Sequence, residues 1–155
     1  MITLDDLALA LPLYFANASL LFVMRRGLLG KLHRMDRPVC EGLFGKNRTW
    51  MGAGLIVLVS ASGYFLLGKG FLVLPALGMI AGVHISSMLK RGMMMKESLP
   101  LPPIDQLDFF IGGAAGLALC GLYFSDLPMM MVLTFFIHLI SNVIAHLAGL
   151  KDVWW

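Results

Sequence analysis

Two acidic residues, three positions apart, are the most distinctive chemical feature of the sequence. Asp105 and Asp108 lie in the segment PPIDQLDF (102–109), and on a helical turn this spacing places both on one face. Two carboxylates on one face suit a hard cation such as Mg²⁺, which prefers oxygen ligands. The alternative is a solvated helix start, where acidic side chains favour the positive end of the helix dipole. The spacing alone leaves both interpretations open.

A short basic turn is the second candidate site. Its residues are Gly45, Lys46, Asn47, Arg48 and Thr49, directly before an apolar segment. Backbone N–H groups at a helix start, together with Lys or Arg and a hydroxyl group, can bind phosphate oxygens. The GxxxxGK[ST] spacing of a P-loop is absent. The alternative role is membrane anchoring by basic residues on the cytoplasmic side, with Trp50 at the interface.

Polar residues also occur inside the apolar segments. His138, Asn142 and His146 follow one another at intervals of four residues, so they share one helix face. Asn17 and Ser87 lie in two other apolar segments. Polar side chains are costly in lipid and usually face the interior of a helix bundle. These residues are either hydrogen-bonded packing residues or an intramembrane polar site, and a small transporter that uses the stripe is one alternative function.

The composition indicates which elements must position these residues. Of 155 residues, 59% are hydrophobic and 14% are charged, and the mean hydropathy is +0.84; both values indicate lipid as the solvent. A helix needs roughly 20 apolar residues to cross a bilayer. The segments without Asp, Glu, Lys or Arg are 7–24, 51–68, 71–89, 109–124 and 128–150. They predict an all-α, polytopic membrane protein with about five transmembrane helices in a single transmembrane domain, residues 1–155.

The basic residues predict the orientation of these spans. The loops 25–50 and 90–108 and the tail contain 11 of the 12 Lys and Arg residues, and Lys69 is the exception. By the positive-inside rule, both loops are cytoplasmic, the N-terminus is outside and the C-terminus is inside. Asp5 and Asp6 differ from the basic start of a signal peptide, so we expect the first segment to remain as a span. We therefore expect a multi-pass protein of the cell membrane with cytoplasmic functional loops and no nucleic-acid partner.

Glycine spacing predicts where helices approach one another. Gly112 and Gly116 form a small-xxx-small step that lets two helix backbones come close. Further candidates for this role are Gly52, Gly54, Gly78 and Gly82. The alternative is that glycine is simply common in membrane helices.

Four segments in chain order resemble the CDP-archaeol synthase family, within the wider membrane CTP transferases that include CDP-diacylglycerol synthases. The segments are LPLYFANAS (11–19), LFGKNRTWMG (43–52), PPIDQLDF (102–109) and HLISNVIAHLAGLKDVWW (138–155). The resemblance implies an enzyme that joins CTP to a membrane lipid phosphate and releases pyrophosphate. It implies Mg²⁺ as cofactor, with Asp105 and Asp108 as metal ligands, and Arg48, Lys90 and Arg91 as phosphate-binding side chains.

The sequence departs from the family pattern in three places. In GVHISSMLKR (82–91), Val83 stands where the family has an acidic residue, and valine cannot bind a metal. Lys46 and Asn47 replace the usual Asp-Gly, and Met51 replaces an Arg. These departures leave a second hypothesis, a non-catalytic family member that binds nucleotide or lipid or scaffolds a membrane partner. The lipid chains, the nucleotide preference and a homodimer stay open.

Overall fold

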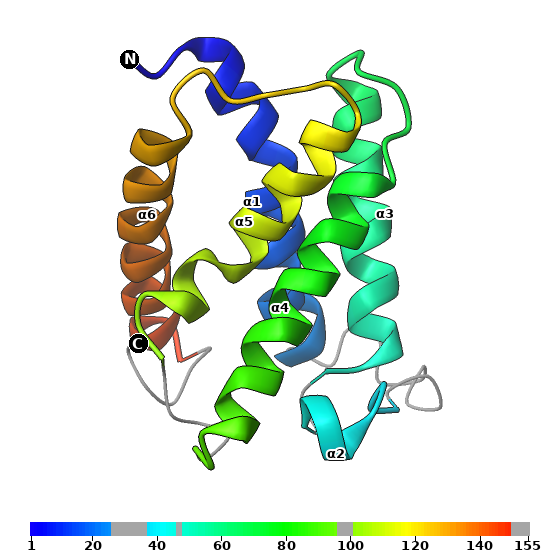
Figure 1. Ribbon diagram of the computed structural model, residues 1–155, viewed down its shortest axis with the longest axis vertical. Helices are drawn as coiled ribbons and strands as arrows, with labels where there is room; N and C mark the ends of the chain where they lie inside the picture. The colour runs from blue at the N-terminus through cyan, green and yellow to red at the C-terminus, as the bar shows by residue number, and fades with distance from the viewer. Residues whose placement is uncertain (26–36, 46–47, 96–100, 150–155) are drawn as a thin grey trace.

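Helices account for the regular structure of the chain. The computed structural model describes residues 1–25, 37–45, 48–95 and 101–149, and this part contains six helices and no strand (Figure 1). They are α1 (Leu4–Arg25), α2 (Glu41–Phe44), α3 (Trp50–Leu66), α4 (Leu74–Gly92), α5 (Ile104–Leu119) and α6 (Leu127–Leu147). The prediction of an all-α fold is confirmed.

Each of the five apolar segments forms a helix, and the largest difference in bounds concerns the fourth. The predicted span 109–124 is helix α5, which begins at Ile104 and ends at Leu119. Within the described residues, α6 is the one helix that is long and apolar enough to cross a membrane by length and composition, and α3 is a shorter apolar helix. The number of spans and their orientation stay predictions.

Local signals in the sequence explain two of the helix starts. The Thr49 side chain accepts a hydrogen bond from Gly52 N at 3.2 Å and caps α3. Asp126 caps α6 in the same way by accepting from Met129 N, and Pro128 follows in the first turn. Such caps satisfy backbone N–H groups that have no partner inside the helix.

Helices α4 and α5 pack backbone against backbone through glycine. A Cβ atom on Gly112 would lie 2.0 Å from the carbonyl oxygen of Gly78, and one on Gly82 would lie 2.1 Å from that of Asp108. A Cβ on Gly116 would lie 2.3 Å from the carbonyl oxygen of Leu74. The predicted close approach is confirmed at Gly78, Gly82, Gly112 and Gly116. It is wrong at Gly54, where a Cβ would meet nothing within 4 Å.

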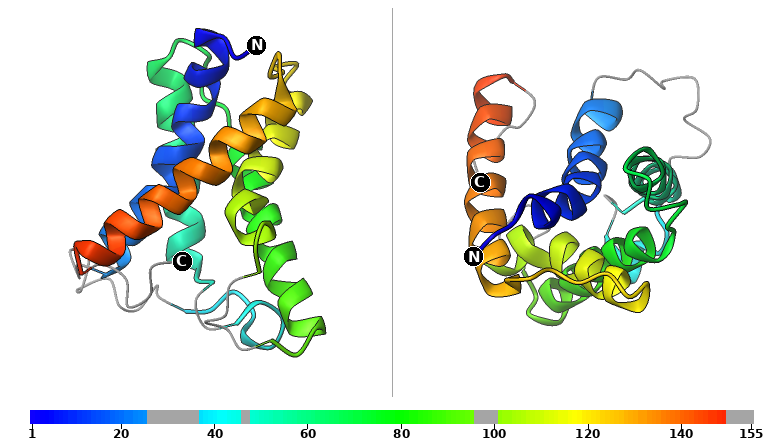
Figure 2. Two further views of the ribbon diagram at one scale, coloured as in Figure 1. Left: turned by 90° about the vertical axis from the view of Figure 1, so that its left-hand side faces the viewer. Right: turned by 90° about the horizontal axis from the view of Figure 1, so that it is seen from above.

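Helix α1 lies beside α3 and closes the core. The fully buried Tyr64 donates a hydrogen bond of 2.9 Å to the carbonyl oxygen of Leu9. Helix α6 crosses the bundle obliquely, and its C-terminal half lies apart from α4 and α5 (Figure 2). Tyr14 of α1 joins α6 through a 2.7 Å hydrogen bond with Thr134. Phe109 of α5 contacts His138 of α6, with ring centroids 5.7 Å apart.

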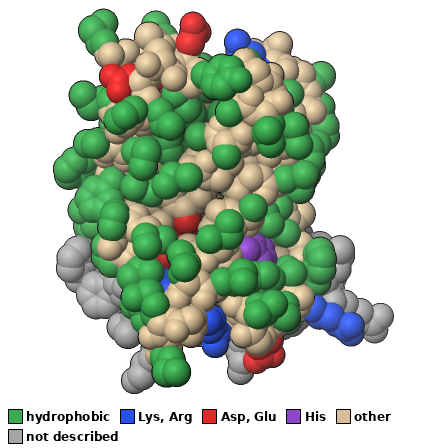
Figure 3. Space-filling model, in the orientation of Figure 1, with side chains coloured by type: hydrophobic (Ala, Val, Ile, Leu, Met, Phe, Trp, Pro, Cys, Tyr) green, Lys and Arg blue, Asp and Glu red, His purple; other side chains and the backbone are tan. Residues whose placement is uncertain are grey.

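The surface is apolar around the middle of the bundle. Large side chains such as Phe15, Leu58 and Ile140 are more than half exposed. Figure 3 shows apolar side chains over the middle of one face, with charged side chains mostly near its two ends. Soluble monomers rarely expose apolar patches of this extent, so this surface suits a lipid environment.

A buried carboxylate fixes the end of the bundle that contains the chain start. Asp6 is 2% exposed and accepts hydrogen bonds from Thr3 N at 2.8 Å and Thr3 Oγ1 at 2.9 Å. It also accepts from Ser125 N at 2.7 Å and from the Ser125 hydroxyl group. Hydrogen bonds from Ser125 and Thr3 hold the pKa of Asp6 far below its usual range, although burial acts in the opposite direction. Asp6 thereby ties α1 to the connection between α5 and α6.

Candidate functional site

The two predicted acids lie in the first turns of α5, against the last turns of α4. Asp105 Oδ2 accepts hydrogen bonds from Leu101 N at 2.9 Å and from Lys90 Nζ at 2.6 Å. The Lys90 and Asp105 side chains are only 15% and 20% exposed. The second oxygen, Oδ1, is buried and has no hydrogen-bond partner among the described residues. A buried carboxylate oxygen without a partner is costly, so this atom is suited to a ligand.

Asp108 is held by two hydrogen bonds, one from α4 and one from its own helix. Ser86 Oγ of α4 lies 2.5 Å from Asp108 Oδ2. Within α5, Phe109 N donates to Asp108 Oδ1 over 2.6 Å. Each carboxylate oxygen can accept two hydrogen bonds or bind a metal with its second lone pair. The carboxylate is therefore fixed in orientation and retains free lone pairs.

Arg48 reaches the same place from the segment that precedes α3. An isolated antiparallel bridge between Pro38 and Thr49, with a 2.8 Å bond from Val39 N to Arg48 O, fixes the backbone there. The guanidinium group donates through Nε to Ser87 Oγ of α4 at 2.9 Å. Burial lowers the pKa of Arg48, whereas the negative charges of Asp108 and Asp105 raise it. The two acids and this cation therefore share one electrostatic environment.

The donor set fits Mg²⁺. No cluster of three or more His, Cys, Asp or Glu side chains that could hold a metal occurs in the described part of the chain. Mg²⁺ is commonly bound by one or two carboxylates, with substrate phosphates and water as its other ligands. Asp105 and Asp108 would supply the two carboxylates, and the unpartnered Asp105 Oδ1 is the observation that favours this assignment.

Comparisons with known proteins show the family to which the chain belongs. The sequence model of the family described as CDP-archaeol synthase (CarS-like) matches residues 56–155. The CDP-archaeol synthase of Thermofilum pendens is 35% identical over 163 residues, which cover 94% of this chain and 78% of that protein. This chain belongs to the CDP-archaeol synthase family.

Other relatives extend the match to nearly the whole chain. The CDP-archaeol synthase of Aeropyrum pernix is 31% identical, with 98% of this chain and 92% of that protein covered. That of Methanocaldococcus jannaschii is 37% identical over 81 residues, about half of each protein. No solved structure matches the chain. The resemblance seen in the four sequence segments is therefore confirmed.

The CDP-archaeol synthase fold brings several predicted site residues together. Asp105, Asp108, Lys90 and Arg48 lie in one cluster, and Ser87 joins it as the partner of Arg48. Arg91 follows Lys90 in the last turn of α4. Their roles in binding metal and phosphate stay predictions.

The predicted phosphate-binding turn is described in part. Lys46 and Asn47 lie outside the described residues. Gly45 ends α2 with a φ of 85°, in the left-handed region that favours glycine. The Thr49 side-chain oxygen caps α3 through Gly52 N, so its position is fixed by the helix start.

One polar residue of the other helices contacts the neighbourhood of the acids. His138 of α6 packs against Phe109, the neighbour of Asp108, and Asn142 is buried one turn further along α6. Asn17 is half-buried on α1. Their membership of an intramembrane polar site stays a prediction.

Two features of α4 were not among the predicted site residues. Ser86 contacts Asp108, and the i, i+4 spacing of Ser86 and Lys90 is the sequence signal that could have placed it on the site's face. His84 packs edge-on against Phe44 of α2, with ring centroids 4.4 Å apart, so α2 covers α4 next to the site.

Val83 is 7% exposed, and its carbonyl oxygen lies 3.0 Å from Ser86 Oγ and 2.9 Å from Ser87 Oγ.

Proposed function

We propose that this chain is a CTP-dependent cytidylyltransferase that makes a CDP-activated lipid from a membrane lipid phosphate and releases pyrophosphate. Membership of the CDP-archaeol synthase family supports the reaction class. The observation that carries the proposal is the mostly buried cluster of two carboxylates and two cations at the start of α5, in which one carboxylate oxygen has no partner among the described residues.

The reaction makes modest chemical demands on the protein. An oxygen of the lipid phosphate attacks the α-phosphorus of CTP, and the bond from that phosphorus to the bridging oxygen of the β-phosphate breaks. The nucleophile is already an anion, so no strong general base is required. The site has to neutralise phosphate charge, align the two reactants and stabilise the departing pyrophosphate.

The described residues can meet these demands. Asp105 and Asp108 would hold Mg²⁺, which would neutralise phosphate charge when bound. Lys90 binds Asp105 Oδ2, so it fixes this carboxylate while Oδ1 stays available. Arg48, anchored to Ser87 through Nε, can direct its terminal nitrogens to phosphate oxygens. The mostly buried position of these groups strengthens each electrostatic contact.

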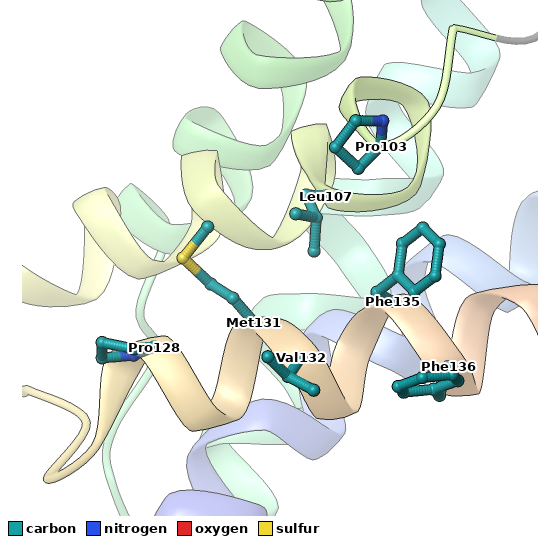
Figure 4. A pocket seen from close by; sticks show the side chains of 7 residues that line it. All are labelled: Pro103, Leu107, Pro128, Met131, Val132, Phe135 and Phe136. Carbon is teal, nitrogen blue, oxygen red and sulfur yellow. The ribbon is translucent and has the colours of Figure 1, made fainter.

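An apolar groove next to the acids supports a lipid substrate. It has a volume of about 500 Å³ and lies between α5 and α6 (Figure 4). Its lining residues are Pro103, Leu107, Pro128, Met131, Val132, Phe135 and Phe136. Leu107 stands between Asp105 and Asp108 in the sequence, so the groove borders the helix turn that carries the acids. A lipid in this groove would have its phosphate near the cluster and its apolar chain along α6.

The membrane arrangement follows from the same features. We propose five spans formed by α1, α3, α4, α5 and α6, with the N-terminus outside and the C-terminus cytoplasmic. The apolar surface of the bundle and the concentration of Lys and Arg in two loops and the tail support it. The acids at the start of α5 would then be reached by CTP from the cytoplasm.

The test is a turnover assay with the purified protein in detergent. CTP labelled in the cytosine ring, Mg²⁺ and a panel of lipid phosphates with ether- or ester-linked chains are supplied together. We expect label in the lipid fraction and release of pyrophosphate, both abolished by a metal chelator. If no lipid phosphate accepts label under conditions where a related family member is active, the chain is a non-catalytic member and the proposal is wrong.

A further inference from the structure

Two neighbouring serines of α4 each contact a charged residue that comes from another segment. Ser86 is 1% exposed and contacts Asp108 of α5; Ser87 is 8% exposed and accepts from Arg48 of the segment before α3. Among the described residues, Asp105 forms an ion pair with Lys90, and Arg48 feels the charge of both acids without an ion pair to either. The two hydroxyl groups thus bind an anion and a cation that would otherwise be free to pair with each other.

Serine in a helix commonly donates its hydroxyl hydrogen to a carbonyl oxygen of the preceding turn. Both hydroxyl groups here lie within hydrogen-bond distance of the Val83 carbonyl oxygen, at 3.0 and 2.9 Å. If this were their whole role, neither side chain would need a partner from another segment. The second contacts therefore require an explanation.

The number of hydrogens decides how these contacts are shared. A hydroxyl group has one hydrogen to donate. Ser86 Oγ is 2.5 Å from a carboxylate oxygen and 3.0 Å from a neutral carbonyl oxygen. Hydrogen bonds to a charged acceptor are shorter and stronger, so Ser86 donates to Asp108. Ser87 donates to the Val83 carbonyl oxygen and accepts from Arg48. Each of the two hydroxyl groups then donates its single hydrogen to one acceptor.

The glycine contact between α4 and α5 makes the Ser86 bond a rigid one. A Cβ atom on Gly82 would lie 2.1 Å from the carbonyl oxygen of Asp108, so the two backbones touch one turn before Ser86. The backbone of Ser86 therefore cannot move away from Asp108 unless α4 and α5 separate. The carboxylate is fixed from α4 by Ser86 and from its own helix by Phe109 N.

We propose that Ser86 is a positioning residue that orients the Asp108 carboxylate for Mg²⁺ and the bound nucleotide, while Ser87 holds Arg48 off the acids so that its guanidinium group meets phosphate. This inference rests on the proposed function. Ser86 touches neither substrate nor metal in this account. It acts through Asp108, because a ligand that is hydrogen-bonded in the correct orientation binds metal more tightly.

The test measures how Mg²⁺ and CTP together raise the thermal stability of the purified protein in detergent. In Ser86→Ala we expect the Mg²⁺ concentration for half-maximal stabilisation to rise by about 10–100-fold, with unliganded stability close to that of the parent. Ser86→Thr keeps the hydroxyl group and should restore the Mg²⁺ dependence to within about threefold of the parent, well below that rise of about 10–100-fold. Ser60→Ala is the matched control, because Ser60 is buried on α3 and its Oγ has no partner among the described residues.

Each outcome has a definite meaning. A parent protein that neither responds to Mg²⁺ with CTP nor labels lipid overturns the proposed function. A responsive parent with an unchanged Ser86→Ala titration overturns this inference alone. If Ser86→Ala does not fold, Ser86→Cys keeps the volume with a weak donor, and its titration decides by the same criterion. Loss of response in Ser60→Ala would show that any buried serine matters, and would also overturn the inference.

Discussion

Asparagine in place of Asp108 separates the metal-binding role of this carboxylate from its role in the fold. The amide has nearly the same shape and can accept one of the two hydrogen bonds that come from Ser86 Oγ and Phe109 N. One hydrogen bond to a charged group contributes about 1.5–3 kcal/mol. The variant also no longer buries a charge, which offsets part of that loss. We expect unliganded stability to fall by less than about 2 kcal/mol.

The effect on turnover should be much larger. An amide oxygen is a weaker ligand than a carboxylate for a hard cation, and the site loses one negative charge next to Mg²⁺. We expect kcat to fall at least about 100-fold, which corresponds to about 2.7 kcal/mol of transition-state stabilisation. The assay is label transfer from CTP to lipid phosphate at saturating Mg²⁺, with Tm measured on the same preparation.

Asp105→Asn provides the contrast that makes this prediction sharp. Asp105 forms a mostly buried ion pair of 2.6 Å with Lys90, and removing one partner of a buried pair typically costs about 3–5 kcal/mol. This variant should therefore lose more stability than Asp108→Asn, in which the main loss should be turnover. Asp5→Asn is the control, because Asp5 is an exposed acid in the first turn of α1. Parent-like turnover and Mg²⁺ response in Asp108→Asn would show that the paired acids are only a helix start, and would refute the reasoning.

Three further predictions concern the fold and the lipid groove. Gly112→Ala should prevent recovery of folded protein, because its Cβ would lie 2.0 Å from Gly78 O. Size-exclusion chromatography of detergent extracts measures this recovery. Gly54→Ala is the control and should behave like the parent, because a Cβ there would meet nothing within 4 Å. Asp6→Asn should lower stability by about 1.5–3 kcal/mol at pH 7. Since the folded pKa of Asp6 is below its unfolded value of about 4, the parent's advantage should shrink as pH falls below 4, and a constant Tm difference from pH 7 to pH 3 would contradict this. Val132→Trp should fill the groove between α5 and α6 and raise KM for the lipid phosphate at unchanged KM for CTP; equal effects on both substrates would argue against a lipid chain there.

The helices could be predicted because charge-free segments are rare outside membrane spans. The segment 109–124 is short for a span at 16 residues, which predicts a helix that takes residues from Ile104–Asp108, and α5 does begin at Ile104. Its end at Leu119 could not be predicted, because the absence of charge does not mark where a helix stops. Ile104–Asp108 is helical although it contains two acids, since Lys90 and Ser86 of α4 provide partners for them inside the structure. A helix that receives its polar partners from a neighbour can extend beyond its apolar segment, and the sequence of one segment does not show which residues supply those partners.

Glycine positions show the same limit. Gly78, Gly82, Gly112 and Gly116 share a spacing of four within their helices, and the spacing predicted a close contact that the structure confirms. Gly54 lies on α3, and a Cβ there would meet open space. Spacing gives the face that residues share, but the identity of the helix against that face depends on how the whole bundle packs.

Residue type decided how well the site could be predicted. Acids and cations stand out in an apolar sequence, so Asp105, Asp108, Lys90 and Arg48 could be predicted as candidates, and the structure places them in one cluster. Ser86 was missed as a site residue, because a serine in a helix can satisfy itself on its own backbone. Its role depends on the contact with Asp108, which only the packing of α4 on α5 creates.

Val83 shows why a missing family acid does not by itself remove the metal site. Its side chain is 7% exposed in the core of the bundle, one turn before the serines that contact Asp108 and Arg48. Mg²⁺ needs only one or two protein carboxylates when phosphates and water complete its coordination. A third carboxylate at this position would add a buried negative charge near two others, and burying it would cost stability unless a cation were bound. If Asp105 and Asp108 bind Mg²⁺ as proposed, the valine would weaken metal binding in the absence of the nucleotide, and the two acids would suffice once CTP supplies further ligands.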